Sequence, residues 1–145
     1  GLRGSLLGLA IVYIAQTVPV AIYMLRGYFE TIPESMEEAA VVDGCNRYQV
    51  ITRISLPLAL PSVMSTGLYV FMIAWNEFLF ALLFLIERRE RWTVSLGLSQ
   101  LSGSIEVPTT ILMAGSIVIT IPVILLFFAA EKALVEGLTA GAEKG

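Results

Sequence analysis

The sequence contains no histidine and only one cysteine, Cys45, among its 145 residues. Without histidine there is no Ser-His-Asp or Cys-His catalytic arrangement, and the commonest metal ligand is missing. A single cysteine cannot close a disulfide within the chain or form a zinc-binding cluster. No G-x-x-x-x-G-K-[ST] run is present, so the chain lacks this phosphate-binding loop of ATPases. The sequence thus indicates no catalytic residue, no metal site and no cofactor.

Charged residues are also scarce, at 14% of the chain against 57% hydrophobic residues. Ordinary soluble domains carry about 25% charged residues, so this chain has too few to cover a water-facing surface. The high apolar share excludes intrinsic disorder, and a net charge of −3 offers no basic surface for nucleic acid. The composition therefore predicts an integral membrane protein surrounded by lipid.

Three apolar stretches are long enough to cross a bilayer, which takes about 20 residues. They cover residues 6–25, 56–86 and 111–130, and the second span is expected over 61–86. No basic segment of the signal-peptide kind precedes the first, so we expect it to be a true span, in a chain whose beginning is missing. The third holds no charged residue, and Pro122 is expected to kink it. We predict an all-α membrane protein with about three spans.

The second apolar stretch is too long for one straight span. As a helix over residues 56–86 it would measure about 46 Å, against about 30 Å of hydrocarbon. Asn76 and Glu77 interrupt it. We therefore expect a span over residues 61–75, a bend near 76–77, and a re-entrant or outward-lying helix over 78–86.

Two polar connections, residues 26–55 and 87–110, separate the spans, and residues 131–145 form a tail that is rich in small residues from Gly137 onward. Three spans place the two connections on opposite sides of the membrane. Basic residues are only slightly more frequent on the side of 26–55, so the positive-inside rule barely favours that side as cytoplasmic. Glu131 and Lys132 are expected to end the third span.

Local signals in the first connection predict two short helices joined by a sharp turn. Thr31-Ile32-Pro33-Glu34 fits a capping box that starts the first helix. That helix is expected to end at Asp43, with Gly44 in the left-handed conformation. Asn46-Arg47-Tyr48-Gln49 fits a second N-cap, and Pro57 is expected to close the second helix.

The residues of this connection resemble a known motif, the EAA loop of binding-protein-dependent ABC importer permeases, a MetI-like family. The match consists of Glu38-Ala39-Ala40, Asp43-Gly44 and Ile54-Ser55-Leu56-Pro57. The chain is further similar to the carbohydrate branch, near the smaller permease subunit of maltose-type systems, through residues 27–33, 75–78 and 137–141. The resemblance runs over essentially the whole chain, as the C-terminal half of a six-span subunit.

The resemblance implies a multi-pass subunit of a sugar importer in a bacterial-type inner membrane. It places residues 26–55 and 131–145 in the cytoplasm and 87–110 outside. Glu38, Ala39, Ala40, Asp43 and Gly44 would form the coupling helix that docks on an ATPase subunit. The implied partners are a second permease subunit, two ATP-binding subunits and an extracytoplasmic solute-binding protein. ATP is then hydrolysed by a separate chain, so this subunit is not itself an enzyme.

Trp75, Asn76 and Glu77 are the candidates for the translocation path. Glu77 is the only acidic residue in the second apolar stretch, and ionisable groups at membrane depth usually face a cavity, a partner or a pathway. Surrounding aromatic rings suit the apolar faces of sugars. The alternative is that Trp75 is a belt residue and Asn76-Glu77 marks the outer water interface. The resemblance also allows the sugar site to belong mainly to the other permease subunit.

The sequence is also compatible with two other functions. A related importer would carry a polyamine, phosphate or amino acid with the same machinery. A small membrane scaffold or anchor would not transport at all, and residues 26–55 would then be interfacial amphipathic helices without a docking partner.

Overall fold

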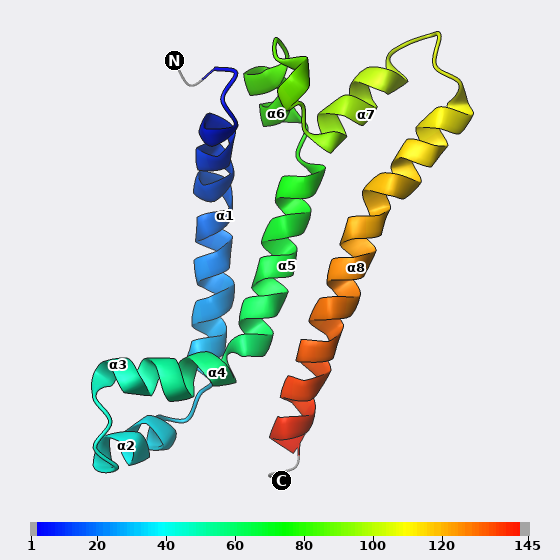
Figure 1. Ribbon diagram of the computed structural model, residues 1–145. Helices are drawn as coiled ribbons and strands as arrows, with labels where there is room; N and C mark the ends of the chain where they lie inside the picture. The colour runs from blue at the N-terminus through cyan, green and yellow to red at the C-terminus, as the bar shows by residue number, and fades with distance from the viewer. Residues whose placement is uncertain (1–2, 143–145) are drawn as a thin grey trace. The chain divides into compact units, whose positions relative to one another are not determined.

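The computed structural model describes residues 3–142, with side chains over 3–132 (Figure 1). All regular structure in this described part is helical. The elements are α1 (Leu6–Phe29), α2 (Glu34–Val42), α3 (Arg47–Val50), the π-helical turn η1 (Ile51–Ser55), α4 (Leu56–Leu58), α5 (Leu60–Asn76), α6 (Leu79–Leu85), the 3₁₀ turn η2 (Arg89–Arg91), α7 (Val94–Ser102) and α8 (Thr109–Ala142).

The chain divides into two compact units, each made of segments distant in sequence. The first unit contains the chain up to Val18 together with Val70–Phe127. The second unit contains Pro19–Tyr69 and the described residues from Phe128 onward. Helices α1, α5 and α8 contribute to both units, and all other elements belong to one.

Within the residues that the structure describes, two helices are long and apolar enough to cross a membrane, α1 and the Thr109–Lys132 part of α8. Helix α5 has 17 residues, about 26 Å at 1.5 Å per residue, which is the lower limit for a span. It becomes a third candidate span together with the helical run Arg47–Leu58, from which it is bent by 69°. Helix α5 ends at Asn76 and α6 begins at Leu79, at the site of the expected bend.

The expected capping box at Thr31 is wrong. Helix α2 begins at Glu34 after Pro33, which provides no side-chain cap. The Thr31 hydroxyl instead donates to the Tyr28 carbonyl oxygen at 2.7 Å. That carbonyl belongs to the last turn of α1, where helix geometry leaves acceptors unpaired, so Thr31 serves the end of one helix and not the start of the next.

Pro57 does not close the second short helix, because the helical run continues past it to the end of α4 at Leu58. The break comes before Pro61. This proline has no N–H for the Pro57 carbonyl and disfavours the helical conformation of Leu60. At the bend, the Leu58 carbonyl oxygen accepts a hydrogen bond from the Tyr28 hydroxyl at 2.8 Å. The chain therefore turns at the junction of α4 and α5.

Glu131 and Lys132 do not end the last helix, which continues to Ala142. Pro122 lies inside this helix, which continues past it. The two charges mark the end of the apolar stretch that suits lipid, whereas alanine and leucine beyond them favour helix in water as well. The expected tail thus begins as a continuation of α8, and residues 143–145 lie outside the described residues.

The core of the first unit forms around α6. Leu9 of α1, Ala81 and Leu85 of α6, and Leu96 of α7 are all buried. Aromatic side chains pack around them, among them Tyr13 and Trp92. The short helix α6 is therefore held between α1 and α7, although it is too short to be stable alone.

Candidate functional site

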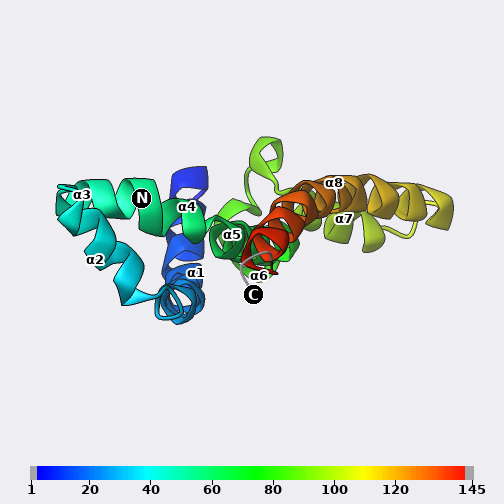
Figure 2. The same ribbon diagram turned by 90° about the horizontal axis from the view of Figure 1, so that it is seen from below.

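In the second unit, α2 lies beside α3 and η1 (Figures 1 and 2). We call Glu34–Ser55 the coupling hairpin, after the role that its resemblance to the EAA loop implies. Its turn has the geometry of a Schellman motif. The Cys45 N–H donates to the Ala40 carbonyl at 2.9 Å, and the Gly44 N–H to the Val41 carbonyl at 3.0 Å. Gly44 has a φ of +86°, the left-handed conformation expected for it. A Cβ atom there would meet nothing within 4 Å, so backbone conformation alone requires glycine.

The start of α3 carries the N-cap that its sequence predicted, and the cap takes the form of a complete capping box. The Asn46 side chain accepts from the Gln49 N–H at 2.9 Å, and the Gln49 side chain accepts from the Asn46 N–H at 2.8 Å. Farther along, the buried Ser55 hydroxyl donates to a Glu37 carboxylate oxygen at 2.9 Å. Hydrogen bonds thus stabilise the coupling hairpin both at its turn and near its base.

The candidate coupling residues do not all face the same surroundings. Ala40 is buried, whereas Ala39 is exposed and lines an open hollow of about 520 Å³ together with Met36 and Leu58. Glu38 lines a separate hollow of about 770 Å³. The exposed Asp43 caps the C-terminus of α2. The alanine pair therefore has two roles, with Ala40 inside the hairpin and Ala39 at its surface.

The tip of the coupling hairpin exposes apolar side chains. Val41 is 60% exposed and Val42 is 86% exposed. Both line the hollow that also contains Glu38. The same hollow is lined by Glu37 and Arg47, and an apolar tip with a charged rim is typical of a surface that another protein covers.

In the first unit, Glu77 binds the start of α6 and also reaches α1. Its Oε1 accepts from the Phe80 N–H at 2.7 Å, and its Oε2 accepts from the Ala81 N–H at 3.0 Å. The same Oε2 accepts from the Tyr13 hydroxyl at 2.8 Å. A carboxylate at a helix N-terminus pairs N–H groups that have no partner in the helix. Both oxygens of Glu77 are therefore engaged within the chain.

Trp75 also makes structural contacts, whereas Asn76 lies in the open. The Trp75 indole N–H donates to the Ile119 carbonyl of α8 at 3.1 Å, and the Trp75 carbonyl accepts from the Ser95 hydroxyl of α7. Asn76 is exposed and lines a groove of about 360 Å³ between α5, α7 and α8. Of the three candidate path residues, Asn76 alone lines this groove.

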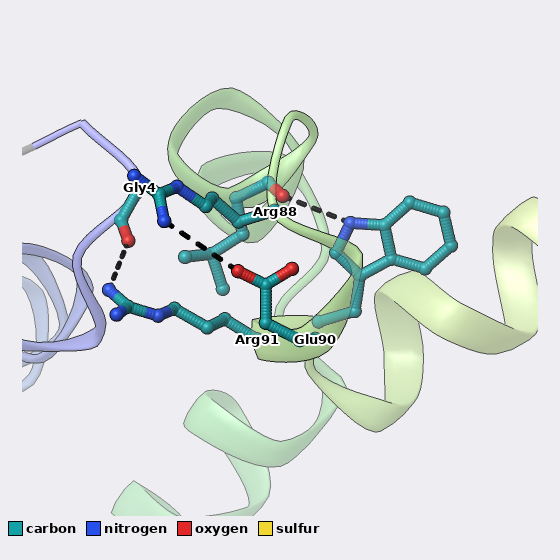
Figure 3. A network of polar contacts seen from close by, with 6 residues as sticks. Gly4, Arg88, Glu90 and Arg91 are labelled. Atoms are coloured by element: carbon teal, nitrogen blue, oxygen red, sulfur yellow. Dashed lines mark hydrogen bonds and ion pairs between the residues drawn. The ribbon is translucent and has the colours of Figure 1, made fainter.

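A polar network fixes the beginning of the described chain to the segment after α6 (Figure 3). The Gly4 N–H donates to the Phe84 carbonyl at 2.7 Å, and the Gly4 carbonyl accepts from the Arg91 guanidinium at 2.7 Å. An ion pair joins Arg88 and Glu90, with 3.7 Å between the guanidinium Nη1 and the carboxylate Oε1. Gly4 has a φ of +73°, and a Cβ there would lie 3.2 Å from the Arg88 side chain. The positive φ favours glycine here, and a larger residue would also require the Arg88 side chain to move slightly.

Sequence reasoning missed the partners that hold these sites together, Tyr13, Tyr28 and Ser55. A signal existed for Tyr13, since a tyrosine in one apolar stretch and a carboxylate in another are expected to form a hydrogen bond in lipid.

Among the described residues, no group of three or more Cys, Asp or Glu side chains is placed to hold a metal ion.

Residues 2–139 match the model of a protein family described as "Binding-protein-dependent transport system inner membrane component". The chain belongs to this family. It is 41% identical over 145 residues to the inner membrane ABC transporter permease protein YcjP of Escherichia coli, covering 100% of this chain and 51% of that protein. It is 43% identical over 134 residues to the trehalose/maltose transport system permease protein MalG of Thermococcus litoralis, covering 92% and 48%.

A third relative in the family is the trehalose transport system permease protein SugB of Mycobacterium tuberculosis, with 38% identity over 147 residues, covering 100% of this chain and 53% of that protein. The chain spans about half the length of the curated relatives it matches. These matches confirm the resemblance to permeases. The family is one of transport components of the inner membrane, in agreement with the apolar helices.

Proposed function

We propose that this chain is part of the permease subunit of an ATP-driven sugar importer. The observation that carries the proposal is the coupling hairpin, a closed two-helix element with an exposed apolar tip in a membrane permease. The names of the relatives support sugar as cargo, since two are permeases of trehalose/maltose and trehalose transport systems. The proposed partners are a second permease subunit, two ATP-binding subunits and an extracytoplasmic solute-binding protein.

The coupling hairpin is connected to the spans by side chains of the second unit. Glu37 of α2 is bonded to Ser55 at the end of η1. The helical run that contains Ser55 continues to Leu58, whose carbonyl is bonded to Tyr28 near the end of α1. A displacement of α2 by a docked ATPase subunit would therefore reach both α1 and α5. This is how the hairpin would transmit nucleotide-driven motion.

Direct measurement of transport tests the function. The full-length subunit, assembled with its partners in proteoliposomes, is expected to take up trehalose or maltose only when ATP is supplied. Uptake of a polyamine, phosphate or amino acid instead would show a related importer with another cargo. A subunit that never co-purifies with an ATPase would contradict transport and favour a membrane anchor.

Replacing each alanine of the coupling hairpin by leucine is expected to separate docking from folding. Ala39→Leu changes an exposed position, so we expect normal membrane abundance and loss of ATPase co-purification. Ala40→Leu enlarges a buried side chain, at a cost of about 1–3 kcal/mol, so we expect a less stable subunit. Immunoblots of membranes and pull-down of the ATPase measure both. Equal behaviour of the two variants would contradict the different roles given to the pair.

We also propose that the coupling hairpin faces the cytoplasm and residues 87–110 face outward. In a Cys45→Ala background of the full-length subunit, a membrane-impermeant thiol reagent added to intact cells should label Gly97→Cys of α7. A Cβ at position 97 meets nothing within 4 Å, so this variant is well tolerated. Val42→Cys at the hairpin tip should react only after the cells are opened. The reverse pattern would invert the topology.

A further inference from the structure

The groove between the end of α5, α7 and α8 lies entirely within the first unit. Its volume of about 360 Å³ is in the range of pockets that hold small molecules. Its polar lining comes from three helices, with an amide on α5 and hydroxyls on α7 and α8. These polar residues are Asn76, Ser95, Ser99, Ser102 and Ser116.

Most of these hydroxyls are left as hydrogen-bond acceptors. Ser95 donates its proton to the Trp75 carbonyl, Ser102 to the Ser99 carbonyl at 2.7 Å, and Ser116 to the Leu112 carbonyl at 2.9 Å. A hydroxyl oxygen that has donated its single proton keeps lone pairs that accept. These oxygens therefore suit a ligand that brings many O–H donors.

Two lining groups supply donors as well. Asn76 uses one amide N–H on the Met72 carbonyl at 2.9 Å, which leaves its other N–H as a donor and its oxygen as an acceptor. The Ser99 hydroxyl has no hydrogen-bond partner within residues 3–132. A ligand whose groups both donate and accept satisfies this mixture, and a sugar hydroxyl does both.

None of the described residues that line the groove carries a charge. Its remaining lining is aliphatic, from Leu98, Leu112 and Ile119. A phosphate, ammonium or carboxylate group would lose hydration here without gaining a counter-charge. The C–H faces of a sugar ring, by contrast, match the aliphatic side chains. The lining thus favours a neutral polyhydroxylated solute over a charged one.

The groove also lies where lipid cannot satisfy its polar groups. Leu112, Ser116 and Ile119 belong to the part of α8 that is long and apolar enough to span a membrane. Hydrocarbon offers no donor to the lone pairs that these side-chain oxygens keep and no acceptor to the Ser99 hydroxyl, so a polar solute in the groove would satisfy them. We propose that this groove binds the neutral sugar during its passage and forms one wall of the path. The proposal rests on the proposed function.

Uptake by variants of the full-length subunit in the complete transporter tests the groove. Ser99→Leu removes the unpartnered hydroxyl and adds bulk, and should raise the KM for trehalose or maltose uptake about tenfold. Ser99→Thr keeps the hydroxyl and should restore a nearly normal KM. The matched control is Ser104→Leu, at an exposed serine outside the groove, which should leave KM unchanged.

Thiol labelling gives a readout independent of transport. In the Cys45→Ala background, Ser99→Cys should react with a small impermeant thiol reagent, and trehalose or maltose should slow the reaction whereas inorganic phosphate should not. Ser104→Cys, at an exposed serine outside the groove in the segment proposed to face outward, should react and show no protection by sugar.

The two proposals fail in different ways. A wild-type transporter that takes up sugar, together with an unchanged KM in Ser99→Leu and no protection of Ser99→Cys, would overturn the groove and leave the proposed function standing. A wild-type transporter without sugar uptake would overturn the proposed function. Protection of Ser99→Cys from the thiol reagent by the sugars would then still support a polyol site in the groove. A lack of protection would refute that site. If Ser99→Leu fails to reach the membrane, the labelling of Ser99→Cys decides.

Discussion

Gly44→Val is expected to abolish solute-stimulated ATPase activity and uptake while the subunit stays in the membrane at normal abundance. Gly44 has a φ of +86°, which valine adopts at a cost of about 1–2 kcal/mol or more, because it is β-branched. The open space around the residue gives no steric reason for loss. The strain would instead break the Schellman bonds that close α2 and displace the hairpin tip with Val41 and Val42.

Gly44→Asn provides the matched control, because asparagine tolerates the left-handed conformation better than other residues that bear a Cβ. We expect it to retain most of the coupled activity. ATPase pull-down on Gly44→Val would show whether docking or signal transmission is lost. Normal stimulated ATPase and uptake in Gly44→Val, with the ATPase bound as usual, would show that the coupling hairpin does not couple the two.

Glu77→Gln is expected to destabilise the subunit more than it changes transport by each assembled complex. The two carboxylate oxygens accept three hydrogen bonds, from the Phe80 and Ala81 N–H groups and the Tyr13 hydroxyl. Glutamine keeps one acceptor oxygen and turns an N–H₂ group toward donors. Leaving a donor unpaired in the interior costs about 1–3 kcal/mol, so we expect less subunit in the membrane and a lower Tm of the purified transporter.

Tyr13→Phe is the companion variant for Glu77→Gln. It removes the bond between α1 and Glu77 and leaves both bonds to the α6 backbone, so we expect a smaller loss of stability. Uptake divided by the amount of assembled complex separates the two roles of Glu77. A Glu77→Gln transporter with normal Tm and abundance but altered uptake would support the path role first inferred from its sequence position. A lower Tm and abundance with normal uptake per assembled complex would show that Glu77 stabilises the contact between α1 and α6.

The break after Asn76 shows how far local signals reach. An apolar stretch too long for the bilayer, interrupted by a carboxylate, predicted that one helix would stop and another begin there. The partner of Glu77 left no local signal, because Tyr13 lies 64 residues earlier in the chain and could be found only by pairing polar groups of two apolar stretches. Sequence position suggested a path residue, and the contacts favour a structural one.

The sequence by itself determined the class of protein, the positions of the apolar helices and the shape of the turn at Gly44. These follow from composition, from the length of apolar runs and from residues with particular backbone preferences, all of which act over a few neighbours. The tertiary structure alone decided that Ala40 is buried while Ala39 is exposed, that Tyr28 binds the Leu58 carbonyl, and that α5, α7 and α8 enclose a groove. Those facts depend on which segments meet in space, and packing between distant helices leaves no periodic trace in the chain.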